Sequence, residues 1–137
     1  MTFIVPGEPK AQGRPRFTTH GGFPRAYDPK TSVDFKARVA LCAKESGLIS
    51  TNGAVKVSIE VHIKRPQAMC RKKDFKGLIP CGKRPDCDNY AKSVMDALSG
   101  IAFRDDGQVQ ELLVRKWYHE IGGSPRTEIS IEAFPEI

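Results

Sequence analysis

The chain has 137 residues, a length that fits one compact domain, so we expect a single domain over residues 1–137. Its hydrophobic fraction of 39% and charged fraction of 28% are ordinary for globular proteins and exclude a disordered or fibrous class. Lys and Arg number 22 against 16 Asp and Glu, and the net charge of +6 favours a polyanionic partner such as DNA or RNA. No apolar run approaches the roughly 20 residues that cross a bilayer, so we expect no membrane partner.

The cysteines bear on the cellular compartment. Cys42, Cys70, Cys81 and Cys87 lack the paired C-x-x-C spacing of zinc sites, and no signal peptide directs the chain to an oxidising compartment. We therefore expect free thiols in a cytoplasmic protein. A zinc site formed by Cys70, Cys81 and Cys87 with a histidine is the alternative.

The chain begins with a predicted strand and a basic loop. Residues 2–5 form a short apolar run that Pro6-Gly7 ends, a pattern typical of a strand followed by a turn. Residues 8–29 are rich in proline and glycine, which predicts an extended loop. The basic side chains of this loop are Lys10, Arg14, Arg16 and Arg25.

The next predicted element is a helix that Thr31 or Ser32 caps and Gly47 ends. Apolar residues recur in it at helical spacing, so we expect it to pack on a sheet. These residues are Val33, Ala37, Ala40, Leu41 and Ala43.

Residues 55–64 alternate apolar and polar side chains over ten positions, which predicts a strand with one buried face. His62 falls on the polar phase of this strand. We therefore expect His62 to face solvent and leave it out of the site.

Residues 64–84 concentrate the positive charge of the chain. They hold eight basic side chains against the single acid Asp74, a local balance of +7, so the remainder of the chain is nearly neutral. Such a block next to a candidate site favours an interaction segment, and a solvated loop without a ligand is the alternative.

The last part of the chain is predicted to hold a helix and two strands. The helix starts near Asp88 and stops at Ser99-Gly100, and a turn follows at residues 104–107. Residues 109–119 and 127–134 read as two strands that pair in a hairpin. The predicted fold is therefore an α+β domain in the order β-α-β-α-β-β, with a mixed sheet of about four strands covered by two helices.

Three carboxylates stand out in this region. Asp86 and Asp88 lie two residues apart at a helix entrance, and Asp106 lies on the turn after that helix. Neighbouring carboxylates repel one another, and a hard divalent cation such as Mg²⁺ or Mn²⁺ relieves that repulsion. Lys92, four residues beyond Asp88, is placed to neutralise charge on a scissile phosphate. The alternatives are an Asp88–Lys92 ion pair, helix caps and an ordinary turn.

The run from Arg84 to Lys92, continued by Asp96-Ala97-Leu98 and Asp105-Asp106-Gly107-Gln108, resembles the signature of RusA-type Holliday junction resolvases. Pro9-Lys10 and the segment 14–17 are also similar to that family. The resemblance implies a homodimer with a mixed sheet that cuts four-way junctions in DNA recombination and repair.

The resemblance also implies roles for single residues. Asp86, Asp88 and Asp106 become the catalytic, Mg²⁺-binding acids and Lys92 the catalytic lysine. Asn89 is expected to orient the acids and Asp96 to support Lys92. Independently of the resemblance, Phe75 is a candidate wedge at the branch point, by analogy with apolar side chains that unstack bases.

Two functions are compatible with these residues: a metal-dependent endonuclease acting on branched DNA, and a non-catalytic basic module that binds branched or single-stranded DNA. In both, basic side chains of the two loops contact phosphates. The residues expected to do so are Lys10, Arg14, Arg16, Arg71, Lys72, Lys73, Lys76, Lys83 and Arg84.

Overall fold

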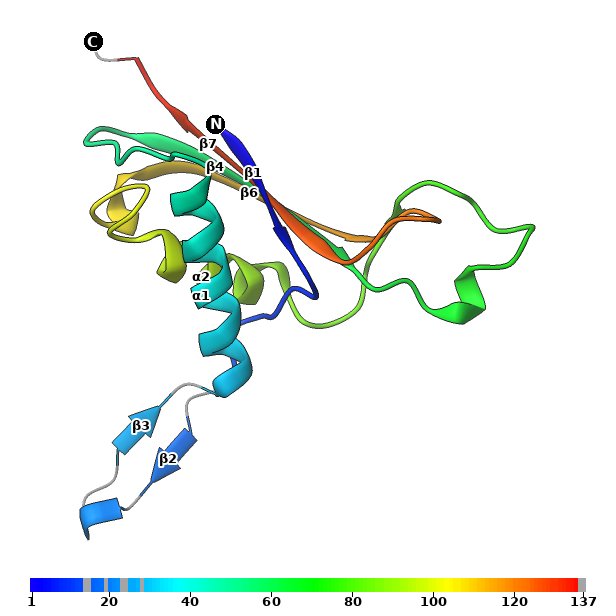
Figure 1. Ribbon diagram of the computed structural model, residues 1–137, viewed down its shortest axis with the longest axis horizontal. Coiled ribbons are helices and arrows are strands. Elements are labelled where there is room, and N and C mark those ends of the chain that lie inside the picture. Colours follow the sequence, from blue (N-terminus) through cyan, green and yellow to red (C-terminus); the bar gives the residue numbers. More distant parts are fainter. Residues whose placement is uncertain (14–15, 19, 23–24, 28, 136–137) are drawn as a thin grey trace.

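The computed structural model describes residues 1–13, 16–18, 20–22, 25–27 and 29–135. In this part of the chain it shows an α+β fold with two α-helices and a five-stranded mixed sheet (Figure 1), so the predicted class is confirmed. The strands are β1 (Thr2–Pro6), β2 (Arg16–Thr18), β3 (Arg25–Tyr27), β4 (Val55–Ile63), β5 (Ile79–Pro80), β6 (Val109–Tyr118) and β7 (Arg126–Ala133). The helices are α1 (Lys30–Glu45) and α2 (Cys87–Leu98), with 3-10 turns at His20–Gly22, Gln67–Met69 and Asp106–Gln108.

The main sheet has the strand order β1-β7-β4-β6-β5. β4 runs parallel to β6, while the other neighbouring pairs are antiparallel. Parallel neighbours need a crossover connection, and here the segment between β4 and β6 provides it and carries α2.

The hairpin predicted for residues 109–119 and 127–134 is wrong. Both strands exist, but β4 lies between them: Ile59 is in register with Val114 of β6 on one side and with Ile129 of β7 on the other. Val55, Val57, Ile59 and Val61 of β4 are fully buried, so a central position removes more apolar surface from water than an edge would. Sequence alternation identifies a strand but does not identify its partners.

The core lies between one face of this sheet and the two helices, which Figure 1 shows on the same side of it. α1 contributes Phe35 and Val39, and α2 contributes Val94 and Leu98, all with at most 1% of their surface exposed. This packing holds α2 firmly against the sheet beside β6. The start of α2 is thereby set in a fixed position.

The predicted buried face of α1 needs correction. Val33 and Leu41 are 50% and 55% exposed, and the buried residues are Ser32, Phe35, Val39 and Ala43. Both sets have helical spacing, and contact with the sheet selects the set that buries the large Phe35 ring.

The start of α1 also differs from the prediction. The helix follows Pro29 without a side-chain cap. Ser32 instead uses its hydroxyl to accept a hydrogen bond from the backbone N–H of Gly13 at 3.0 Å. A serine read as a helix cap therefore anchors the first part of the preceding basic segment.

The segments predicted as loops contain short strands. β2 and β3 pair with each other in a small antiparallel sheet that projects beyond the start of α1 (Figure 1). β5 adds to the edge of the main sheet by pairing with β6. None of the described helices is long and apolar enough to span a bilayer.

Candidate active site

Helix α2 and the residue before it carry predicted catalytic side chains at the protein surface. Its buried side includes Tyr90, Ala91 and Leu98, while Asp88 and Lys92 lie on its exposed side. Asp86 is exposed at the position just before the helix, and its side chain makes no capping hydrogen bond. Asp86 is thus not occupied as a helix cap, which was one of the structural alternatives.

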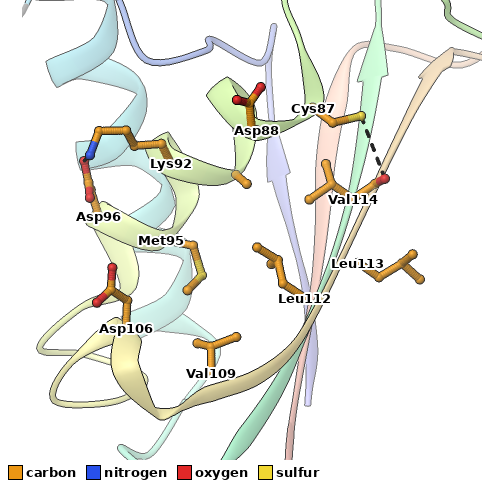
Figure 2. Close-up of a pocket in the computed structure, with 11 residues that line it drawn as sticks. Cys87, Asp88, Lys92, Met95, Asp96, Asp106, Val109, Leu112, Leu113 and Val114 are labelled. Carbon is orange, nitrogen blue, oxygen red and sulfur yellow. Dashed lines mark hydrogen bonds and ion pairs between the residues drawn. The ribbon is translucent and has the colours of Figure 1, made fainter.

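An open cavity of about 680 Å³ lies between α2 and β6 (Figure 2). Its charged lining consists of Asp88, Lys92, Asp96 and Asp106, and its apolar wall is formed by Met95, Val109, Leu112 and Leu113 among others. Four of the predicted site residues therefore share one cavity. Leu112 and Leu113 remain 45% and 38% exposed, so the apolar wall is open to solvent.

Asp86 and Asn89 line a neighbouring pocket of about 380 Å³ together with Arg84 and Pro85. Asp88 and Asp106, in contrast, lie at opposite ends of the larger cavity (Figure 2). The ten steps from Asp88 to Leu98 rise about 15 Å along the helix axis. A single chain therefore places Asp86 and Asp88 near each other and leaves Asp106 at the other end of α2.

Lys92 is positioned by an acid other than Asp88. Its ammonium group lies 3.8 Å from the carboxylate of Asp96, as the four-residue spacing predicts. Asp96 also pairs with Lys36 of α1 at 3.2 Å. The Asp88–Lys92 ion pair is not formed within the described residues, and the Asp88 carboxylate instead accepts a hydrogen bond from the backbone N–H of Asn89 at 3.1 Å.

Side-chain hydrogen bonds of the residues around Asp106 hold the turn that carries it. The side chain of Asp105 accepts a hydrogen bond from the backbone N–H of Gln108, and the Gln108 side chain accepts one from the backbone of Arg104 at 2.8 Å. The Gln108 amide also donates to the carbonyls of Thr51 and Gly53 at 2.7 and 2.9 Å. Asp105 and Gln108 are thus engaged in structure, and Asp106 is the acid of this turn that lines the cavity. Gln108 belongs to the motif in the sequence, but its role depends on Thr51 and Gly53, which only the fold brings near.

Lys116 is a second residue that sequence analysis missed. Its ammonium group donates hydrogen bonds to the carbonyls of Lys83 and Pro85, at 2.5 and 2.8 Å. These bonds tie the segment just before Asp86 to β6. Its position within an alternating strand contained no signal for this role.

Part of the predicted basic set gathers beside Asp86. Lys10, Lys83 and Arg84 line a pocket of about 310 Å³ with Tyr90 and Tyr118. Burial raises the pKa of Tyr90 to about 12, so this phenol stays neutral at physiological pH. This pocket places three cations beside the segment that leads into the predicted acids.

The other predicted DNA contacts lie elsewhere or outside the described residues. Arg71, Lys72, Lys73 and Lys76 are exposed in the long segment between β4 and β5. Arg16 is described only through the backbone of β2, and Arg14 lies outside the described residues.

His62 is buried, contrary to the prediction that it faces solvent. It does lie on the face of β4 away from the helices, but Trp117 of β6 and Arg126 of β7 flank it in register. Its Nε2 lies 2.8 Å from the Glu128 carboxylate. Burial and the nearby Arg126 guanidinium lower the pKa of His62, so the neutral ring is favoured.

Glu60, His62 and Glu128 form the one compact metal-ligand-like group among the described residues, with ligand atoms within 4.8 Å of one another. The carboxylate of Glu60 pairs with Arg115 at 3.1 Å, and that of Glu128 lies 3.7 Å from Arg126. Each acid therefore already has a cationic partner. This cluster is a network of ion pairs across three strands and competes poorly for a cation.

Comparison with known proteins agrees with these features. The family described as "Endodeoxyribonuclease RusA" matches residues 6–132, which include the acids, Lys92 and the basic segments. The chain is also 38% identical over 137 residues to the uncharacterized protein YqaN of Bacillus subtilis (strain 168), covering 96% of this chain and 94% of that protein. The chain belongs to the RusA endodeoxyribonuclease family.

Proposed function

We propose that this protein is a Mg²⁺-dependent endonuclease that resolves four-way DNA junctions by paired symmetric cuts, acting as a homodimer in recombination and repair. The observation that carries the proposal is the cavity that Asp88, Lys92 and Asp106 share beside Asp86. Family membership adds the endodeoxyribonuclease activity.

The three predicted catalytic acids suit a hard cation. Asp86, Asp88 and Asp106 offer only oxygen ligands, and none of them pairs with a described arginine or lysine. Their exposure leaves room for a phosphodiester beside the cation. Mg²⁺, or Mn²⁺ in its place, would supply an activated water and stabilise the charge of the departing oxygen. Lys92, held by Asp96, would neutralise negative charge on the phosphate.

A homodimer would bring Asp106 to the other two acids. Asp88 and Asp106 lie at opposite ends of the cavity, and the exposed leucines of β6 form an apolar wall between them. Two copies that pair antiparallel across this wall bring Asp106 of the partner subunit to Asp86 and Asp88. Two-fold symmetry then generates two identical sites, which matches the two-fold symmetry of a four-way junction.

The basic residues would bind the DNA backbone. Arg84 lines the same pocket as Asp86, and Lys10 and Lys83 line a second pocket that also includes Arg84, so these three cations would hold phosphates next to the cut. Arg71, Lys72, Lys73 and Lys76 extend this charged surface along a second segment. Affinity should therefore fall steeply with salt concentration, because bound phosphates release their counterions.

The decisive experiment measures cleavage of a synthetic four-way junction and of linear duplex, with and without a chelator. The variants Asp86→Asn, Asp88→Asn and Asp106→Asn should each lose on the order of 100-fold or more of the cleavage rate while still binding the junction. Asp34→Asn, which alters an exposed acid of α1, is the matched control and should cut normally. Full activity of the three variants would overturn the assignment.

The same experiment tests the non-catalytic alternative. A protein that binds the junction but leaves it intact in Mg²⁺ and Mn²⁺, and that binds neither ion by calorimetry, would be a binding module.

A further inference from the structure

We propose that residues 66–78 form a rigid DNA-binding loop in which Arg65 orders the backbone and Phe75 stacks on an exposed base face at the branch point. The inference rests on the proposed function, because it names the feature of branched DNA that the protein recognises. The loop lies between β4 and β5 and extends beyond the end of the sheet, away from α1 (Figure 1).

Arg65 is a buried charge at the base of this loop, with only 3% of its surface exposed. Its guanidinium donates to the carbonyls of Met69 at 2.8 Å and Gly77 at 3.0 Å, and also to the carbonyl of Phe75. Burying a guanidinium is costly unless its N–H groups find acceptors. Here all three acceptors are carbonyls of the loop. The N–H groups of the buried guanidinium therefore have their partners only when the loop is folded in this way.

Further hydrogen bonds within the loop fix its outer part. Asp74 accepts from the backbone N–H of Arg71 at 2.8 Å and pairs with the Arg71 guanidinium at 3.1 Å. The ammonium group of Lys76 donates to the carbonyl of Lys72 at 3.1 Å. The backbone N–H of Ile121, in the connection between β6 and β7, donates to the carbonyl of Lys76 at 2.9 Å. The loop is therefore tied to itself and to the sheet.

This ordered loop exposes a large apolar ring. Phe75 is 69% exposed although its carbonyl is held by Arg65. Its ring lies against Gly77, where an added Cβ would come within 2.8 Å of the ring. Glycine at position 77 thus leaves the space that the ring occupies.

The surroundings of Phe75 favour DNA as the partner over an apolar protein surface. The loop carries four basic residues and one acid, and that acid is already paired with Arg71. Lysines beside an exposed aromatic ring combine phosphate binding with stacking on a base. A continuous duplex hides its base faces, whereas a branch point exposes the faces of its terminal pairs. Phe75 would thus distinguish branched DNA from duplex.

The test uses a four-way junction with 2-aminopurine at the branch, bound in EDTA so that no cleavage occurs. The parent protein should raise the fluorescence of the probe by unstacking it. Phe75→Ala should abolish most of that rise and weaken junction binding by about tenfold, with little change in duplex binding. Phe75→Trp should keep both properties. Ile49→Ala is the matched control, because Ile49 is another exposed apolar residue at 83% exposure and lies outside the loop.

The role of Arg65 is tested by measuring how well ordered the loop is. Arg65→Lys keeps the charge but cannot make all three hydrogen bonds, so backbone amide exchange in residues 67–77 should accelerate while the protection of β4 stays unchanged. Gly77→Ala should displace the Phe75 ring. Both variants should show the loss of fluorescence seen with Phe75→Ala.

These experiments distinguish a failure of this inference from a failure of the proposed function. Equal fluorescence and equal junction preference in the parent and Phe75→Ala would overturn the stacking role, even if the parent cuts junctions. A parent that fails to cut but shows the Phe75-dependent signal would overturn the nuclease and keep the stacking role. Unchanged amide exchange in Arg65→Lys would overturn the ordering role of Arg65.

Discussion

The carboxylate of Asp96 on α2 lies 3.2 Å from the ammonium group of Lys36 on α1. The same carboxylate lies 3.8 Å from Lys92, so one acid joins the two helices and also positions the proposed catalytic lysine. Asp96 is 38% exposed and Lys92 is 61% exposed, so these pairs contribute little to stability. The two ion pairs are expected to affect the orientation of Lys92.

Asp96→Asn is therefore expected to slow junction cleavage by about tenfold, because Lys92 loses the partner that holds it at the cavity. The free energy of unfolding should change by less than about 1 kcal/mol, as for other exposed ion pairs. Single-turnover cleavage and urea denaturation measure the two effects. Glu111→Gln breaks the Lys56–Glu111 pair at 3.7 Å on the sheet and serves as the control that should cut normally. Equal rates for both variants would remove Asp96 from the site.

Gln108→Ala tests whether the turn places Asp106. The Gln108 side chain joins this turn to the carbonyls of Thr51 and Gly53, so its loss should free Asp106 and leave those carbonyls with one partner fewer. We expect cleavage to fall by about tenfold or more and the free energy of unfolding to fall by about 1–2 kcal/mol. Gln110→Ala, an exposed position of β6, should change neither quantity. Normal cleavage by a measurably destabilised Gln108→Ala would show that the turn is structural only.

Mixing two inactive variants tests the shared site of the homodimer. If Asp106 of the partner subunit completes each site, a heterodimer of Asp88→Asn with Asp106→Asn contains one site with both changes and one site with neither. Co-refolding the two variants should therefore restore nicking of one strand of the junction, whereas each variant alone stays inactive. Mixtures that remain inactive, with heterodimers present by mass spectrometry, would show that each chain holds its own three acids.

The buried His62 is expected to make the free energy of unfolding depend on pH. Burial lowers its pKa below the ordinary value near 6.5, so the unfolded chain takes up a proton at a higher pH than the folded chain. The stabilisation that the neutral ring provides is therefore complete above about pH 6.5 and is lost as the pH falls through the folded-state pKa. Urea denaturation from pH 8 to 5 should show this decline, and His62→Gln should flatten it. An NMR titration of the ring that gives a pKa at or above 6.5 would contradict the prediction.

Local sequence patterns were sufficient for the class of fold and for α2. Strand alternation and helical spacing depend on neighbours a few residues apart, and these repeat directly in the chain. The acids and Lys92 were named from their spacing and from the resemblance to the RusA signature, and their catalytic roles stay predictions.

Tertiary structure decided the order of the strands and the environment of single side chains. Alternation correctly placed His62 opposite the helix-facing side chains of β4, but β6 and β7 supply the residues that bury it. The roles of Arg65, Lys116 and Gln108 were also unpredictable, because their partners are backbone carbonyls 4 to 57 residues away along the chain that only the fold brings near. Local periodicity follows from the geometry of one element, whereas burial and hydrogen bonding depend on which distant elements pack beside it.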